Sequence, residues 1–142
     1  MDLPREGFTL AYSYKRSLGP VLGAFFTALA QGRVLASRTP SGRVIVPPCE
    51  ADPETGEELE ELVEVGPEGR IQSWTWVEDP LARHPLNTPF AFALILLDGA
   101  DTGWILPVAV DSPADLATGQ RVRPRATDTP VTSVAQLIYE PT

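Results

Sequence analysis

The sequence predicts a mainly β protein, with one helix near the N-terminus and a small five-stranded barrel in the C-terminal half. The length of 142 residues suits a single domain with a hydrophobic core. Residues 17–32 carry apolar side chains three and four positions apart, which is the spacing of one helix face. After Gly69, five strand-like segments follow one another, separated by turn-forming residues.

An N-terminal arm and a helix are predicted for residues 1–32, with an extended arm over 1–16. Ser17 begins the helical pattern and Gly32 is placed to end it. The adjacent Phe25 and Phe26 point about 100° apart, which widens the apolar face. This face either packs on the barrel of the same chain or docks on another protein, and both interpretations stay open. The candidate partner-binding residues are Leu22, Phe25, Phe26 and Leu29.

Hairpins are predicted for residues 33–66. A turn signal, Pro40-Ser41-Gly42, interrupts a strand-like stretch that ends at Pro47-Pro48. The following segment, 50–68, has no Lys or Arg and holds nearly half of the 19 acidic residues. Such charge is typical of a solvated hairpin edge, where it discourages strand association. An acidic docking surface or a hard-cation site is the alternative, although the acids lack the spacing of an EF-hand.

A closed barrel is predicted for residues 67–142. The near-continuous apolar run Phe90–Leu97 favours a central strand, and 79–89, with three prolines, favours a loop. Residues 111–118 resemble a short capped helix before the fourth strand. The predicted strands are residues 70–78, 90–97, 102–110, 121–125 and 131–139. Five short strands with one helical insertion fit a small barrel such as an OB-fold.

Catalytic residues are scarce in this sequence. His84 is the only histidine and lies in the proline-rich loop, without a nucleophile motif nearby. Cys49 is the only cysteine and neighbours carboxylates that disfavour a thiolate; alone, it excludes an internal disulfide and a Cys-based zinc site. The sequence therefore predicts no catalytic apparatus. A small independent hydrolase or hydratase acting through His84 is the alternative.

The net charge of −8 argues against nucleic-acid binding unless basic residues gather on one face. Arg121, Arg123 and Arg125 alternate along one strand, so their guanidinium groups project to the same side. This arginine stripe is a candidate contact for phosphates, such as those of coenzyme A, or for an acidic partner; a solvated outer face is the alternative. With Trp74 and Trp76 on one strand face, it also leaves open a stand-alone OB module that binds nucleic acid.

No membrane span or export signal is expected from the sequence. The longest near-apolar stretch, residues 21–30, has about half the length that a bilayer requires. The N-terminus lacks the basic start and apolar core of a signal peptide. We therefore expect a cytoplasmic protein; whether the chain is complete or a domain of a longer protein stays open.

An ordered set of segments resembles a bacterial and archaeal family that joins an N-terminal helix and a rubredoxin-like zinc ribbon to an OB-fold. The segments are GRVIVPP, VEVGPEGRIQSWTWV, TPFAFALILLDGADT and TGQRVRPR. Members are encoded with, and bind to, thiolase-superfamily enzymes acting on acyl-CoA esters. The resemblance implies a partner of such an enzyme.

The ribbon of this chain departs from that family. The family carries two Cys-x-x-Cys knuckles, which here would fall at Arg38 and Ser41 and near Asp52 and Thr55. Tetrahedral zinc needs four soft or borderline ligands, and Cys49 lies outside both pairs. We therefore expect a degenerate, cysteine-free ribbon without metal or other cofactor, whose turns persist.

The cysteine-free pattern resembles more closely the OB-fold domains of actinobacterial steroid side-chain degradation. The segments that carry this likeness are SYKRSLGP and PPCEADPETGEEL. Such domains accompany a MaoC-like enoyl-CoA hydratase and bind a lipid-transfer-protein-like aldolase of thiolase fold, which cleaves a steroid-CoA side chain by a retro-aldol reaction. The resemblance implies a required, non-catalytic component of that carbon–carbon lyase; a partner of a biosynthetic thiolase is the alternative.

Overall fold

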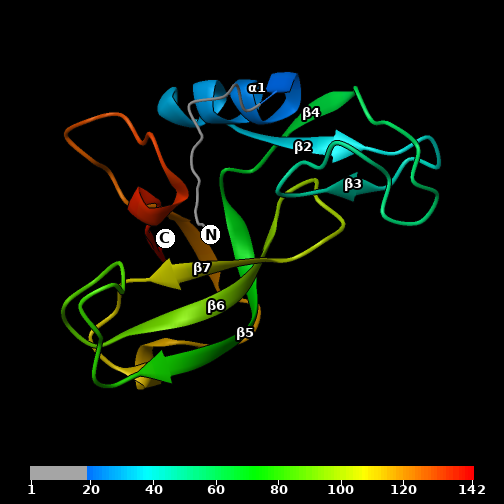
Figure 1. Cartoon of the computed structure of the whole chain (residues 1–142). Helices are drawn as coiled ribbons and strands as arrows, with labels where there is room; N and C mark the ends of the chain where they lie inside the picture. The colour runs from blue at the N-terminus through cyan, green and yellow to red at the C-terminus, as the bar shows by residue number, and fades with distance from the viewer. Residues whose placement is uncertain (1–18) are drawn as a thin grey trace, which may run out of the picture.

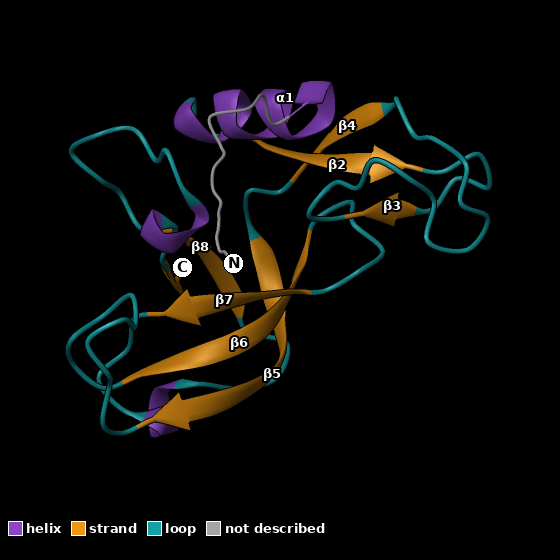
Figure 2. Ribbon diagram, viewed as in Figure 1, coloured by secondary structure: helices purple, strands orange, loops and turns teal. Residues whose placement is uncertain are grey.

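A helix and a three-stranded sheet lie beside a closed five-stranded barrel (Figures 1 and 2). The computed structural model describes residues 19–142, so the predicted arm 1–16 and the predicted helix start at Ser17 lie outside the described residues. No helix in the described range is both long and apolar enough to cross a bilayer.

Helix α1 spans Gly19–Ala30 and ends where the sequence predicts. Gly32 adopts a φ of +79°, which favours glycine, and its N–H donates to the Leu29 carbonyl. Arg33 N–H donates to the Ala28 carbonyl, which completes a Schellman-type end. The helix therefore stops cleanly and the chain turns back into the sheet.

The sheet has the order β3-β2-β4, with β2 (Val34–Arg38) between β3 (Val44–Ile45) and β4 (Leu62–Val65). Both pairings are antiparallel. A second hairpin, 50–59, contains the isolated bridge between Ala51 and Glu58. The hairpins predicted for 33–66 are present, and the acidic segment runs through the second hairpin into β4.

The barrel is closed and mixed, with strand order β5-β6-β7-β9-β8 and pairing of β8 with β5. Only β7 and β9 run parallel, at Val108 and Tyr139. This is the five-stranded barrel of the predicted OB-fold. The strands are β5 (Gly69–Val77), β6 (Phe90–Leu97), β7 (Trp104–Val108), β8 (Arg121–Pro124) and β9 (Tyr139–Pro141).

The helix predicted for 111–118 is wrong in extent, because only the 3₁₀ turn η1 (Pro113–Asp115) forms. Ser112 Oγ caps it by accepting a hydrogen bond from Ala114 N–H at 3.1 Å. The next residue, Leu116, is extended and 6% exposed. Burying this side chain in the core draws the chain out of the helix after one turn.

The strand predicted for 131–139 is also wrong over most of its length. A 3₁₀ turn, η2 (Val134–Gln136), occupies its centre, and β9 begins only at Tyr139. Gln136 Oε1 accepts hydrogen bonds from Thr132 N–H at 2.7 Å and from Ser133 N–H at 3.2 Å. These local bonds satisfy backbone donors that a strand would have paired with its neighbour.

One hydrophobic core joins the helix, the sheet and the barrel. The Phe25 ring on α1 lies 6.0 Å from the Trp104 ring on β7, measured between centroids. Two polar side chains of the β6–β7 connection also bind β3 and the residue after it: Asp101 Oδ2 accepts from Val44 N–H at 2.9 Å, and Thr102 Oγ1 accepts from Val46 N–H at 3.0 Å. The sheet is thereby fixed against the barrel.

Candidate functional site

The outer face of strands β6 and β7 is apolar. Along β6, Ala91 and alternate residues to Leu97 point into the barrel and are buried, while the residues between them are half-buried outside. On β7, Ile105 lies opposite Leu94 and is 64% exposed. An exposed apolar patch of this kind is typical of an interaction surface. The β6–β7 apolar face comprises Phe92, Leu94, Leu96 and Ile105.

A shallow pocket of about 280 Å³ adjoins this face. It lies between the 79–89 loop and η2, and Phe92 and Ile105 form part of its wall. Val134 of η2 also lines it and is 37% exposed. The pocket therefore extends the β6–β7 apolar face toward the C-terminal turn and gives it a recess for an apolar side chain of a partner.

His84 stabilises the 79–89 loop on the outside of the barrel. Its ring lies edge-on to Phe90 and Phe92, with centroids at 5.7 Å and 5.9 Å, and Nδ1 accepts a hydrogen bond from Leu81 N–H at 2.9 Å. Within residues 19–142, no hydroxyl, thiol or carboxylate hydrogen-bonds the imidazole. This geometry gives no support to the hydrolase or hydratase that the sequence left open.

Arg121 is engaged in ion pairs within the chain. Two of its nitrogens bond the two Asp98 carboxylate oxygens, at 2.8 Å and 2.6 Å, and Glu68 lies 3.7 Å away. The hydrogen bonds from Arg121 hold the pKa of Asp98 below its ordinary value. Arg121 thus links β8 to the end of β6, and only a displacement of Asp98 would release it for a ligand.

The other two arginines of the stripe differ from each other. Arg123 Nε lies 3.3 Å from Glu140 Oε2, across the β8–β9 pair. Arg125 is exposed, and among the described residues its guanidinium has no hydrogen-bond or ion-pair partner. Arg121 and Arg123 lie on the exposed side of β8 with the buried Val122 between them, and Arg125 follows the end of the strand. Arg125 is the only member of the stripe that is free of intramolecular pairing in the described part of the chain.

The predicted partner-binding residues of α1 divide into two pairs. Phe25 and Leu29 are 1% and 3% exposed and belong to the core of the chain itself. Leu22 and Phe26 are half-buried, and the Phe26 ring lies edge-on to Phe25 at 5.2 Å. Phe25 and Leu29 therefore pack in the core of this chain. Of the four residues, only Leu22 and Phe26 have side-chain surface exposed to a partner.

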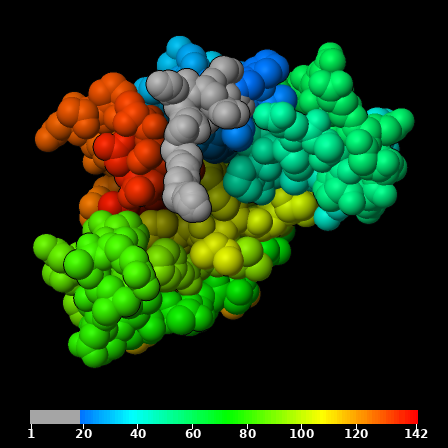
Figure 3. Space-filling view, viewed as in Figure 1, coloured from blue at the N-terminus to red at the C-terminus, as the bar shows by residue number. Residues whose placement is uncertain are grey.

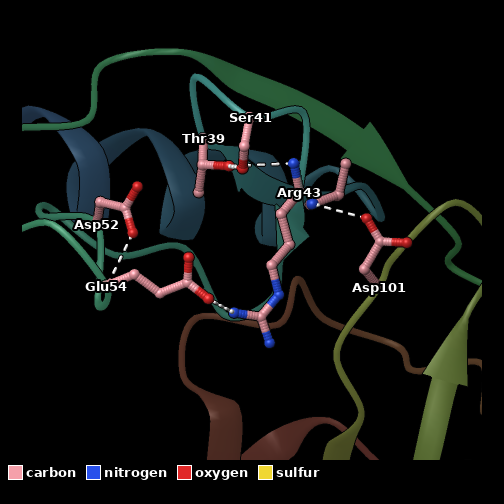
Figure 4. Close-up of polar contacts among 7 residues, drawn as sticks. Thr39, Ser41, Arg43, Asp52, Glu54 and Asp101 are labelled. Atoms are coloured by element: carbon pink, nitrogen blue, oxygen red, sulfur yellow. Dashed lines mark hydrogen bonds and ion pairs between the residues drawn. The ribbon is translucent and has the colours of Figure 1, made fainter.

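Hydrogen bonds hold each of the two turns where the zinc knuckles would fall, and one ion pair joins the two turns (Figure 4). Ser41 Oγ lies 2.9 Å from Thr39 Oγ1, and Asp52 Oδ1 accepts from Glu54 N–H at 2.8 Å. Arg43 Nη1 lies 3.8 Å from Glu54 Oε2 and so joins one turn to the other. Among the described residues, no three His, Cys, Asp or Glu side chains gather in a metal-binding arrangement.

The remaining two knuckle positions are occupied by polar residues with structural contacts. Arg38 lies 3.7 Å from Glu61, and Thr55 Oγ1 accepts a hydrogen bond from Glu57 N–H at 3.2 Å. Burial, and secondly the Asp52 carboxylate, raises the pKa of the Cys49 thiol. Cys49 is therefore protonated at neutral pH and is poorly suited to act as a nucleophile or a metal ligand.

Trp74 and Trp76 share a face, as predicted, but it is the inner face of the barrel. They lie opposite Ala93 and Ala91, and both indoles pack against the core. Bases stack on exposed aromatic rings beside basic residues, and these indoles do not form such a platform. The geometry therefore gives no support to a stand-alone nucleic-acid module.

The β6–β7 apolar face was not identified from the sequence. The near-continuous apolar run Phe90–Leu97 was interpreted only as a central strand. In the structure small alanines fill the inside, opposite the two indoles, while Phe92 and Leu94 point outward. A large apolar side chain at each outward position was the available signal, since a solvated face would carry polar residues there.

Comparison with known proteins relates this architecture to one family. Residues 62–127 match the family model of the ChsH2 C-terminal OB-fold domain. Comparison with curated protein sequences gives no significant match.

Two solved structures have the same fold. A DUF35-family protein of unknown function from Sulfolobus solfataricus superposes with a TM-score of 0.64 at 20% identity, covering 88% of this chain and 85% of that one. A chain of the Ltp2–ChsH2(DUF35) aldolase superposes with a TM-score of 0.64 at 18% identity, covering 89% of this chain and 98% of that one.

Proposed function

Because residues 62–127 match the family model of the ChsH2 C-terminal OB-fold domain, we propose that this chain is a non-catalytic partner of a thiolase-fold, Ltp2-like aldolase. The likeness to the Ltp2–ChsH2(DUF35) aldolase extends over nearly the whole of the matched chain and supports this assignment. The aldolase would supply the acid and base, because the described part of this chain brings no nucleophile and base together.

The observation that carries the proposal is the β6–β7 apolar face. In OB-folds, the second and third strands form the usual binding surface, and β6 and β7 hold those positions. Nucleic-acid-binding OB-folds place basic and aromatic side chains there. Here the surface is largely aliphatic, with Ile105 most exposed, and the chain carries a net charge of −8. A protein surface fits these properties better than a nucleic acid does.

Positioning is the contribution that such a partner would make. A domain docked beside an active site closes the substrate passage and holds the enzyme in its competent form. Misplacement of reacting groups by about 1 Å can cost on the order of a hundredfold in rate. A required partner therefore needs no catalytic residue of its own.

The substrate in this proposal is an acyl-CoA thioester, with a steroid side chain as the acyl group, cleaved by a retro-aldol reaction. A MaoC-like enoyl-CoA hydratase would supply the hydroxylated thioester that such a cleavage consumes. These details follow from the sequence resemblance. Within the same proposal, Leu22 and Phe26 contribute partner contacts, and the arginine stripe contacts coenzyme A or an acidic surface of the partner.

Co-purification with an Ltp2-like aldolase tests the proposal. The two proteins are co-expressed, and the complex is followed by size-exclusion chromatography with mass determination. Ile105→Asp places a charge in the apolar interface, and an unpaired buried charge costs several kcal/mol. We expect the dissociation constant to rise by about a hundredfold. Leu81→Asp is the matched control, because Leu81 is 56% exposed and lies outside the β6–β7 apolar face.

Two results would contradict the proposal. One is the absence of any complex between the wild-type chain and the aldolase. The other is equal binding by the wild-type chain and a folded Ile105→Asp variant, which would exclude the β6–β7 apolar face as the interface. Running the assay in parallel with a biosynthetic thiolase distinguishes the alternative partner, which we expect to bind more weakly.

A further inference from the structure

A groove of about 370 Å³ lies between the C-terminal end of α1 and the segment that follows β8. Figures 1 and 3 show this segment in orange to red, beside the helix. We call it the junction groove, because the helix, the sheet and the barrel all contribute to it. Its apolar lining consists of Leu29, Val34, Pro67, Pro124, Val131 and Leu137.

The polar side chains of the junction groove offer donors almost exclusively. Arg125 lines it with an unpaired guanidinium, and Arg123 uses only Nε for its bond to Glu140. Gln136 is oriented by the three hydrogen bonds that its Oε1 accepts, which leaves Nε2 without a partner among the described residues. Among the described residues of the lining, Glu68 is the only carboxylate, and it lies 3.7 Å from Arg121.

The groove combines an apolar wall with hydrogen-bond donors. Its apolar side chains with partly exposed surface include Pro67, Pro124 and Val131, whereas Leu29, Val34 and Leu137 are only 1–4% exposed and lie beneath them. An anionic group fits beside Arg123 and Arg125, whose guanidinium groups match phosphate and carboxylate oxygens.

We infer that the junction groove binds a small amphipathic anion: an alkyl chain with a phosphate or carboxylate head. The alkyl chain lies on the wall formed by Pro67, Pro124 and Val131, and the head accepts hydrogen bonds from Arg125 and Gln136. The volume falls in the lower part of the range of small-molecule sites, which suits a short chain. No partner protein is needed for this binding, so the titration of the chain alone can fail while the complex with the aldolase still forms, and the reverse.

Titration of the full chain with three probes tests the inference. Octyl phosphate and octanoate share the alkyl chain and differ in the head, and inorganic phosphate has the head alone. Binding is followed by calorimetry and by the amide shifts in ¹H–¹⁵N spectra, which locate the probe. We expect saturable binding of octyl phosphate with shifts at the junction groove, weaker binding of octanoate and no saturation with inorganic phosphate.

Two arginine variants separate the site from general electrostatics. Arg125→Ala removes the unpaired guanidinium and should weaken octyl phosphate binding by at least about tenfold, because hydrogen bonds to charged groups are among the strongest. Arg83→Ala removes an exposed guanidinium of the 79–89 loop, outside the groove, and should leave the affinity within about twofold. Equal losses in both variants would overturn the inference. Equal affinity for inorganic phosphate and octyl phosphate, or no saturable binding of either alkyl probe, would also overturn it.

Discussion

At the scale of single residues, Tyr139 illustrates how the barrel is joined to the rest of the chain. The residue is fully buried at the start of β9, and its hydroxyl donates a 2.7 Å hydrogen bond to the Pro67 carbonyl. Pro67 lies in the connection between β4 and β5. Burial raises the pKa of Tyr139, so the phenol remains a donor over the physiological range of pH.

Removing this donor tests its contribution to stability. In Tyr139→Phe the ring stays in the core, while the Pro67 carbonyl loses its partner. We expect the free energy of unfolding to fall by about 1–2 kcal/mol, with an unchanged denaturant slope. Urea unfolding followed by tryptophan fluorescence measures the change. An unchanged midpoint would show that the hydrogen bond makes no net contribution.

The pair formed by Arg121 and Asp98 predicts a dependence of stability on pH. The pKa of Asp98 lies below its ordinary value of 3.8 because Arg121 bonds its ionised form. Ionised Asp98 therefore stabilises the folded state above the ordinary value, and this contribution is lost as the pH falls through the lowered one. We expect the stability difference between the wild type and Asp98→Asn to be constant above about pH 5 and to shrink below about pH 4.

Urea unfolding at several pH values measures this difference. The series is repeated in about 1 M salt, which screens exposed charges strongly. Because both side chains are about half exposed, salt should reduce it. A difference between wild type and variant that grew as the pH fell would contradict the proposed role of the pair.

At the scale of elements, Gly69 controls how closely β5 and β6 approach. A Cβ at Gly69 would lie 2.5 Å from the Leu96 carbonyl oxygen and 2.9 Å from Leu97 Cα, both backbone atoms. Gly69→Ala should therefore force the two strands apart and destabilise the protein by about 1–3 kcal/mol. Gly23→Ala is the matched control, since its Cβ meets nothing within 4 Å in α1.

Thermal and urea unfolding of the two glycine variants give the comparison. Gly23→Ala should stabilise the protein by about 0.5–1 kcal/mol, because alanine favours a helix. Equal effects of the two substitutions would mean that chain entropy, and not the close approach of β5 to β6, explains the glycine at position 69.

The residues at the knuckle positions of the ribbon-like hairpins predict that the protein binds no zinc. The four knuckle positions hold Arg38, Ser41, Asp52 and Thr55, a set without soft ligands. The Arg43–Glu54 ion pair connects the turns that a metal would otherwise join, and a hydrogen bond within each turn stabilises it. Elemental analysis of the purified chain should give no stoichiometric zinc, and chelator should not change its stability. About one zinc per chain would overturn this prediction.

Elements whose local and tertiary requirements agree could be predicted from the sequence. Helix α1 ends at a glycine that suits its left-handed conformation, and the Phe90–Leu97 run forms β6 with the predicted bounds. The two 3₁₀ turns could not be predicted in extent. The burial of Leu116 and the side-chain bonds of Gln136 decide them, and both depend on the final packing of the barrel.

The candidate site was predicted only in part for the same reason. The alternation of the arginine stripe predicted a shared face, and Arg121 and Arg123 lie on the exposed side of β8, whereas Arg125 follows the end of that strand. The pairing of the first two with Asp98 and Glu140 depends on strand register, which one strand alone does not reveal. The exposure of Ile105 depends on what covers β7, and that is likewise a property of the assembled barrel.

At the scale of the whole molecule, acidic charge and apolar surface are separated along the chain. Residues 50–68 hold nine acidic side chains, several of which pair with arginines of the neighbouring hairpins. The β6–β7 apolar face contains no acidic residue. A partner can therefore bury the apolar face without desolvating the acidic segment. The charge of the acidic segment also discourages the free protein from associating through its sheet edges.

The most direct test of the account is the retro-aldol activity of the Ltp2-like aldolase with and without this chain. Cleavage of a β-hydroxyacyl-CoA thioester is measured by quantifying the ketone that is released. We predict little turnover by the aldolase alone, restoration when the wild-type chain is added, and weak restoration by Ile105→Asp at the same concentration. Full activity of the aldolase in the absence of this chain would contradict the central claim.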